Sequence, residues 1–125
     1  MLDMAQLACF SATARPGEAR RFYGKILGLH LVEETAFALV FDANGTSLRI
    51  QKAPAHDPAA HTALGWVAPD LRGMIHRLIL KGVRFERYAP LQQDDDAIWT
   101  APGGAQVAWF KDPDGNVISL SEDPR

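Results

Sequence analysis

The sequence predicts an α+β fold in which two βαβββ modules follow each other within a single domain, residues 1–125. The first observation is that strand and helix signals occur in the same order in both halves of the chain. The second is that landmarks recur at matching places. Residues 28–31 (Gly-Leu-His-Leu) correspond to 82–85 (Gly-Val-Arg-Phe), and residues 44–50 correspond to 114–120. An internal repeat of this kind predicts one plan used twice.

Module one is predicted over about residues 5–52. Its first strand covers about Gln6 to Ala14, and a helix follows with Pro16 in the first turn, where proline is favoured. Gly28 ends this helix. Apolar residues inside it recur at helical spacing, namely Ala19, Phe22, Tyr23 and Ile26. Three strand signals follow at residues 29–34, 36–41 and 46–51, with a turn at 42–45.

A linker rich in proline and alanine is predicted at about residues 53–61, before module two at about 62–121. The first strand of module two covers residues 62–68, and Asp70 is a suitable N-cap for the next helix. Gly82 ends that helix. Strand signals follow at residues 83–88, 98–101, 105–111 and 116–121.

Bulk composition excludes several classes of function. A net charge of -2 and a pI near 6.0 give no basic field for nucleic acid. No apolar run approaches the length of a membrane span, and no secretory signal is visible. Cys9 is the only cysteine, so no internal disulfide can form, and we interpret it as a small core residue. We therefore expect a cytoplasmic protein whose partners include neither nucleic acid nor membrane.

The closing segment is the most specific part of the sequence. Residues 110–116, Phe-Lys-Asp-Pro-Asp-Gly-Asn, combine turn residues with flanking apolar runs and predict a hairpin. Together with residues 21–29, Arg-Phe-Tyr-Gly-Lys-Ile-Leu-Gly-Leu, and with the repeat, this hairpin resembles the vicinal oxygen chelate superfamily. That group includes glyoxalase I, bleomycin resistance proteins and extradiol dioxygenases. The resemblance implies a curved mixed sheet, paired modules that form a ligand-binding cup, and a homodimer.

Metal-using members of that superfamily place His, Gln or Glu at four positions, one on the first and one on the last strand of each module. The alignment puts these positions at Ala8, Arg49, Ala63 and Ser119. A guanidinium has no lone pair to offer a metal, and the other three residues are equally atypical ligands. We therefore expect no metal at this site and no other cofactor.

Arg49 and Ser119 should point into the cup, because the apolar residues beside them occupy the opposite face of each strand. An inward arginine suits a small anionic or carbonyl-bearing molecule, and the alternative is an arginine paired with a nearby acid. The predicted binding residues for a small-molecule ligand are Arg49, Ser119, Trp99, Trp109 and His61. The run Asp94-Asp95-Asp96 is interpreted as a solvated loop tip.

The resulting hypothesis is a metal-free protein of this superfamily that binds a small organic, anionic molecule. The alternative is a divalent-metal-dependent lyase, isomerase or dioxygenase of the glyoxalase type. Its displaced metal site would use His61, Gln6 or Gln51. An interaction module with a filled cup is a third interpretation. Elemental analysis of the purified protein separates the first two.

Overall fold

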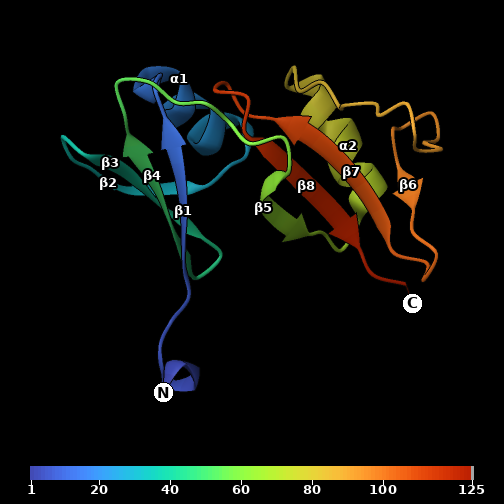
Figure 1. Cartoon of the computed structure of the whole chain (residues 1–125), viewed down its shortest axis with the longest axis horizontal. Helices are drawn as coiled ribbons and strands as arrows, with labels where there is room; N and C mark the ends of the chain where they lie inside the picture. Colours follow the sequence, from blue (N-terminus) through green and yellow to red (C-terminus); the bar gives the residue numbers. More distant parts are fainter. Residues whose placement is uncertain (125) are drawn as a thin grey trace. The chain divides into compact units, whose positions relative to one another are not determined.

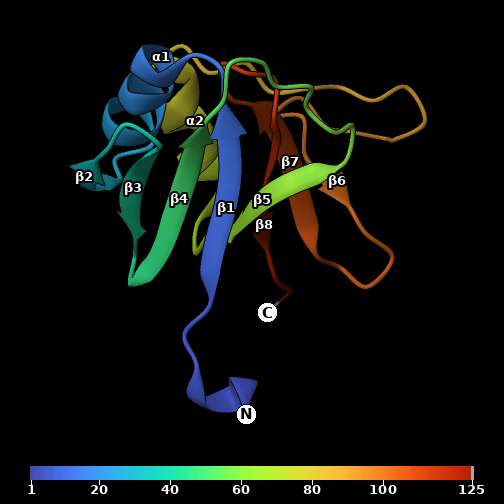
Figure 2. The ribbon, with the colours of Figure 1, turned by 60° about the vertical axis from the view of Figure 1, so that its left-hand side comes forward.

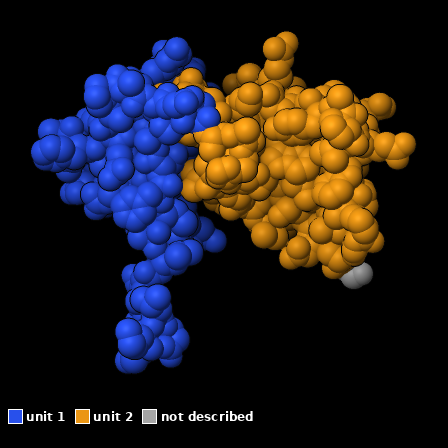
Figure 3. Space-filling model, viewed as in Figure 1, with its two compact units in different colours: residues 1–58 blue, residues 59–125 orange. Residues whose placement is uncertain are grey.

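The computed structural model describes residues 1–124. The chain forms two compact units, Met1–Pro58 and Ala59–Arg125 (Figure 3), and the boundary falls inside the segment predicted as a linker. Within the described residues, no helix has both the length and the apolar character needed to cross a bilayer. Each unit contains one four-stranded mixed sheet with a helix, and this confirms the predicted α+β class.

Unit 1 follows the predicted order, with bounds that differ by one or two residues. A short 3-10 helix (Leu2–Met4) precedes β1 (Ala8–Thr13), and α1 (Pro16–Arg21) continues into a π-helical turn (Phe22–Ile26). The remaining elements are β2 (His30–Glu34), β3 (Ala38–Ala43) and β4 (Thr46–Lys52). The sheet order is β1-β4-β3-β2, with β1 parallel to β4 (Figures 1 and 2).

One face of this sheet packs on the helical segment. Tyr23 is fully buried, and its ring centroid lies 5.9 Å from that of Phe41 on β3. Because side chains alternate along a strand, the residues that share the face of Phe41 form the core. They are Leu39, Phe41, Leu48 and Ile50, all at most 1% exposed. The other face, which we call the helix-free face, carries Arg49.

Unit 2 repeats this plan with β5 (Thr62–Val67), α2 (Leu71–Leu80), β6 (Trp99–Thr100), β7 (Gln106–Lys111) and β8 (Val117–Glu122). The sheet order is β5-β8-β7-β6, with β5 parallel to β8. The predicted cap is confirmed, since Asp70 Oδ1 accepts a hydrogen bond of 3.2 Å from Gly73 N. In this sheet too, a core face alternates with a helix-free face. The core face is formed by Ala108, Phe110, Ile118 and Leu120.

The predicted strand at residues 83–88 is wrong, because only Phe85 forms a bridge there, to Phe110. The predicted strand 98–101 is shortened to Trp99–Thr100, which pairs with the start of β7. The Gln93 side chain bonds backbone groups in or beside both segments. Its side-chain Oε1 accepts a hydrogen bond of 2.7 Å from Tyr88 N, and its Nε2 donates one of 2.8 Å to Ala97 O. These backbone groups are therefore satisfied inside a loop rather than in a sheet ladder.

The closing hairpin forms as predicted. Asp112 is buried, and its Oδ1 accepts hydrogen bonds from Asp114 N at 3.0 Å and Asn116 N at 2.9 Å. Gly115 has a φ of 88°, in the left-handed region that glycine tolerates best. The turn sequence that pointed to the hairpin thus supplies its own hydrogen-bond partners.

Glu34 on β2 ties the sheet of unit 1 to its helix and gives a testable pH dependence. Hydrogen bonds from Arg20 and Lys52, at 2.7 Å each, lower the pKa of Glu34 from 4.5 to about 2. A lowered folded-state pKa stabilises the fold above the unfolded value, so this contribution is lost as pH falls from about 4.5 towards about 2. A carboxyl NMR titration should find this pKa. In a Glu34→Gln variant, this component of the acid denaturation curve should disappear, whereas Glu33→Gln should retain it.

Candidate functional site

The position of Arg49 on the helix-free face is fixed by strand register. Arg49 on β4 lies opposite Phe10 on β1 and Val40 on β3, and Val40 in turn lies opposite Glu33 on β2. Residues directly opposite each other on neighbouring strands share a face of the sheet. We call this set, Phe10, Arg49, Val40 and Glu33, the Arg49 row. It places a cation between two apolar side chains, with an acid at the far end.

Arg49 is half-buried, and within residues 1–124 its side chain makes no ion pair and no hydrogen bond. By contrast, Arg20 and Arg72 both contact carboxylates of their own unit. The sequence left two interpretations of Arg49 open, an anion-binding group or an arginine paired with an acid. In the described part of the chain, no carboxylate pairs with Arg49.

Ser119 occupies the matching place in unit 2. On β8 it lies opposite Trp109 on β7 and Gly65 on β5. A Cβ atom at Gly65 would lie 2.7 Å from Ser119 Oγ, so the absence of a side chain at Gly65 gives this hydroxyl its space. The helix-free face of unit 2 therefore presents a hydroxyl beside an indole.

Aromatic rings continue this face towards β6. The ring centroids of Trp99 and Trp109 lie 6.2 Å apart, and Tyr88 contacts Trp109 edge to face at 5.6 Å. Trp66 lies opposite Leu120 and therefore belongs to the core face. The structure thus brings together two of the predicted binding residues, Trp99 and Trp109, beside Ser119. Tyr88, which sequence reasoning did not single out, completes the cluster.

Strand register identifies the residues opposite the two assigned positions on the last strands. Phe10 lies level with Arg49, two residues after Ala8, and Gly65 lies level with Ser119, two residues after Ala63. A β-bulge between Thr62 and Leu64 shifts the register of β5, and no sequence signal marks it. His61, a further predicted binding residue, precedes β5 and is exposed. Gln51 lies on β4 two residues beyond Arg49, and Gln6 precedes β1.

In neither unit do the residues at these positions fit a divalent metal. Divalent ions in such sites take imidazole, carboxylate or thiolate ligands. In unit 1 the positions hold Phe10 and the Arg49 cation, which repels a metal ion, and in unit 2 they hold Gly65 and Ser119, of which only the Ser119 hydroxyl offers a side-chain lone pair. Over residues 1–124, no group of three or more His, Cys, Asp or Glu side chains is placed to hold a metal.

The acidic run was expected to be a solvated loop tip, and the structure corrects this for two of its three members. Asp94 Oδ1 accepts hydrogen bonds from Asp96 N at 2.9 Å and Ile98 N at 3.0 Å, and its Oδ2 pairs with Arg72. Asp96 contacts both His76 and Arg72 on α2, and these hydrogen bonds lower the pKa of Asp96 below its ordinary value. The run therefore fastens the loop to α2.

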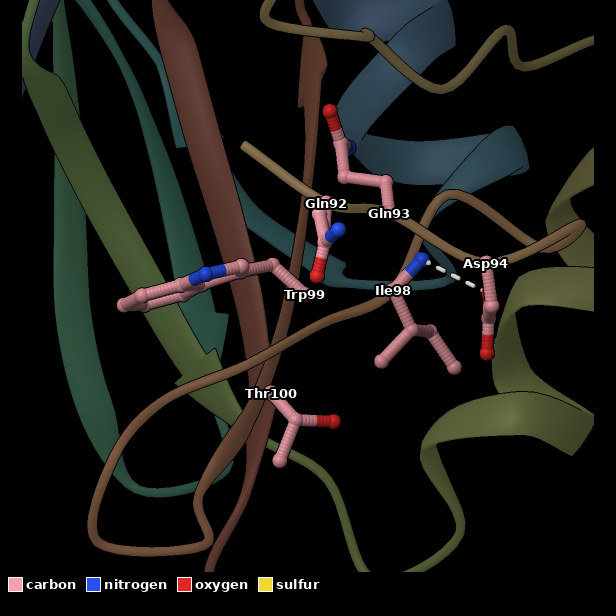
Figure 4. Close-up of a pocket in the computed structure, with 6 residues that line it drawn as sticks. All are labelled: Gln92, Gln93, Asp94, Ile98, Trp99 and Thr100. Atoms are coloured by element: carbon pink, nitrogen blue, oxygen red, sulfur yellow. Dashed lines mark hydrogen bonds between the residues drawn. The ribbon is translucent and has the colours of Figure 1, made fainter. Parts of the chain in front are cut away.

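A cleft of about 420 Å³ lies between this loop and β6 (Figure 4). In Figure 4 the Trp99 indole and the Thr100 side chain extend to opposite sides of the strand, so the indole points away from Thr100. The polar groups of Gln93 and Asp94, which line the cleft, are already occupied by internal hydrogen bonds. We therefore interpret the cleft as part of the loop framework, and we treat the helix-free face of each unit separately as a candidate binding surface.

We predict that the hydrogen bonds of the Gln93 side chain are the main stabilising contacts of this loop. A Gln93→Ala variant loses hydrogen bonds to Tyr88 N, Glu86 O and Ala97 O. Leaving partly buried backbone groups without partners should lower the free energy of unfolding by about 2 kcal/mol. Urea denaturation measures this loss. The exposed neighbour Gln92 provides the control, because Gln92→Ala should change the value by less than about 0.5 kcal/mol. Equal effects of both variants would contradict this role for Gln93.

Comparison with known proteins agrees with this architecture. The family model described as Glyoxalase/Bleomycin resistance protein/Dioxygenase superfamily matches residues 7–120. Comparison with curated proteins finds no match.

Solved structures show the same fold. A lactoylglutathione lyase from Agrobacterium tumefaciens is 18% identical, with a TM-score of 0.73. The match covers 95% of this chain and 93% of the chain of that protein. A glyoxalase/bleomycin resistance protein/dioxygenase from Alicyclobacillus acidocaldarius is 14% identical with a TM-score of 0.75, covering 98% and 93%. A glyoxalase family protein from Enterococcus faecalis is 20% identical with a TM-score of 0.69, covering 95% and 96%. At these identities the likeness concerns the fold alone.

Proposed function

Since the chain belongs to the glyoxalase/bleomycin resistance protein/dioxygenase superfamily, we propose that it is a member that binds a small organic anion through Arg49 without a divalent metal. The fold of this superfamily leaves one face of each sheet free of helices, and fold alone does not determine what such a face binds. The proposal therefore depends on the particular side chains that this chain places there.

The observation that carries the proposal is the half-buried Arg49 without an acid partner in residues 1–124. Its guanidinium presents a planar set of donors that matches a carboxylate in a bidentate arrangement. A partly desolvated cation is costly unless an anion pairs with it. An anionic ligand would supply that missing partner.

The helix-free face of unit 2, taken by itself, also has the composition of a binding surface. Small-molecule sites are usually apolar walls with a few polar groups that fix orientation. The cluster of Trp99, Trp109 and Tyr88 beside the Ser119 hydroxyl has this composition. We propose this cluster as a second, separate surface for a small molecule.

Isothermal titration with benzoate and with its neutral analogue benzamide tests the proposal. The two probes have nearly the same size and ring, and they differ in the charge that Arg49 would recognise. Benzoate is expected to bind at least about tenfold more tightly, because a hydrogen bond to a charged group contributes about 1.5–3 kcal/mol. Equal affinity for the two probes, or binding of benzamide alone, would overturn the proposal.

A further inference from the structure

We infer that the anion bound by Arg49 is an apolar monocarboxylate, with Phe10 as the residue that selects its apolar body. This inference rests on the proposed function and narrows it to a class of ligand. It is carried by the residues around Arg49 on the helix-free face of unit 1, whose positions the strand register fixes.

The residues directly opposite Arg49 on the two neighbouring strands are both apolar, namely Phe10 and Val40. Val40 is buried at 8% exposure, whereas Phe10 is 56% exposed. A ligand whose carboxylate meets the guanidinium would therefore find the Phe10 ring as the accessible apolar group directly beside it.

Phe10 is a large aromatic side chain that is left 56% exposed beside Arg49. The rest of the fold does not need its burial, so its ring is available to a ligand. Its place directly opposite Arg49 puts the ring within reach of any group attached to a bound carboxylate. Burial of this ring against an apolar ligand would remove apolar surface from water.

The charges on the same face select against a dianion. Glu33 ends the Arg49 row, and Asp42 lies opposite Ser47, two residues before Arg49 on β4. One guanidinium can neutralise one negative charge, and a second charge on the ligand would face these two acids. Phosphate monoesters, which are dianions at about pH 8, are therefore disfavoured relative to carboxylates.

Isothermal titration at about pH 8 with acetate, phenylacetate and phenyl phosphate tests this inference on the wild type and two variants. Phe10→Ala removes the proposed selecting ring. Phe37→Ala is the matched control, because Phe37 is 80% exposed and immediately precedes β3, where strand alternation puts it on the other face. Phenylacetate is expected to bind at least about tenfold more tightly than acetate to the wild type and to Phe37→Ala.

In Phe10→Ala the affinity for phenylacetate should fall to within about threefold of that for acetate. The inference is overturned if Phe10→Ala keeps the full preference, or if phenyl phosphate binds more tightly than phenylacetate. Either result leaves the proposed function intact as long as benzoate is preferred to benzamide. A failure of that preference would instead overturn the proposed function itself.

Discussion

A Phe110→Ala variant is expected to lose about 3–5 kcal/mol in free energy of unfolding, the largest stability effect we predict. Phe110 on β7 is 0% exposed, and its ring packs edge to face on Phe85 at 5.4 Å. Truncation of the ring leaves a cavity on the core face of the unit 2 sheet, next to Phe85. The cost combines the lost transfer of an aromatic ring from water with the lost contacts of the atoms around it.

Urea denaturation followed by far-UV circular dichroism measures this loss. Val67→Ala is the control in the same unit, because Val67 is 67% exposed on β5 and its truncation should cost less than about 0.5 kcal/mol. A loss below about 1 kcal/mol for Phe110→Ala would contradict the assignment of this residue to the core.

Arg49→Ala is expected to weaken benzoate binding by about ten- to a hundredfold, the largest effect on binding that we predict. A hydrogen bond to a charged group contributes about 1.5–3 kcal/mol, and each 1.4 kcal/mol corresponds to about a factor of ten in affinity. The binding of benzamide should be nearly unaffected, because it carries no charge for the guanidinium to neutralise. Isothermal titration of both probes into wild type and variant measures the difference.

Glu33→Gln provides a control of opposite sign on the same face. Glu33 lies two strands from Arg49, at about 10 Å by strand spacing, and removing its negative charge should raise benzoate affinity by about twofold at low salt. Arg49→Lys keeps the positive charge without the bidentate donor geometry and should give an intermediate affinity. If benzoate affinity is the same in Arg49→Ala and in the wild type, the role of Arg49 as the anion donor is wrong.

Much of the fold was predictable because its determinants are local. The turn at residues 112–116 has Pro113, Gly115 and a buried Asp112 that accepts two backbone hydrogen bonds, all recognisable from residue types. The alternation that separates Arg49 from Leu48 and Ile50 likewise follows from the period of a strand. Because the two halves of the sequence repeat, the element order predicted for unit 1 could also be predicted for unit 2.

The errors concern non-local contacts. The residue types at 83–88 do not indicate that the Gln93 side chain accepts a hydrogen bond from Tyr88 N and holds this backbone in a loop. Asp96 looks like one member of a solvated acidic run until α2 brings Arg72 and His76 against it. Side chains that act as hydrogen-bond partners across loops override local strand propensity.

The candidate site was predictable in part for the same reason. Turn landmarks fix Arg49 and Ser119, and the structure places both on helix-free faces. The positions opposite them needed strand register, and the bulge in β5 shifts the residue opposite Ser119 by one position, to Gly65. The contact of Tyr88 with Trp109 is a further feature that residue types alone did not indicate.

Benzoate titration before and after dialysis against a strong chelator is the most direct test of the central claim, that Arg49 binds an organic anion without a divalent metal. The same benzoate affinity is expected in both samples, because in neither unit do the matching positions offer a set of metal ligands. Loss of binding after chelation, with recovery on addition of nickel, zinc, iron or manganese, would contradict it. That result would support a metal-dependent site elsewhere in the chain.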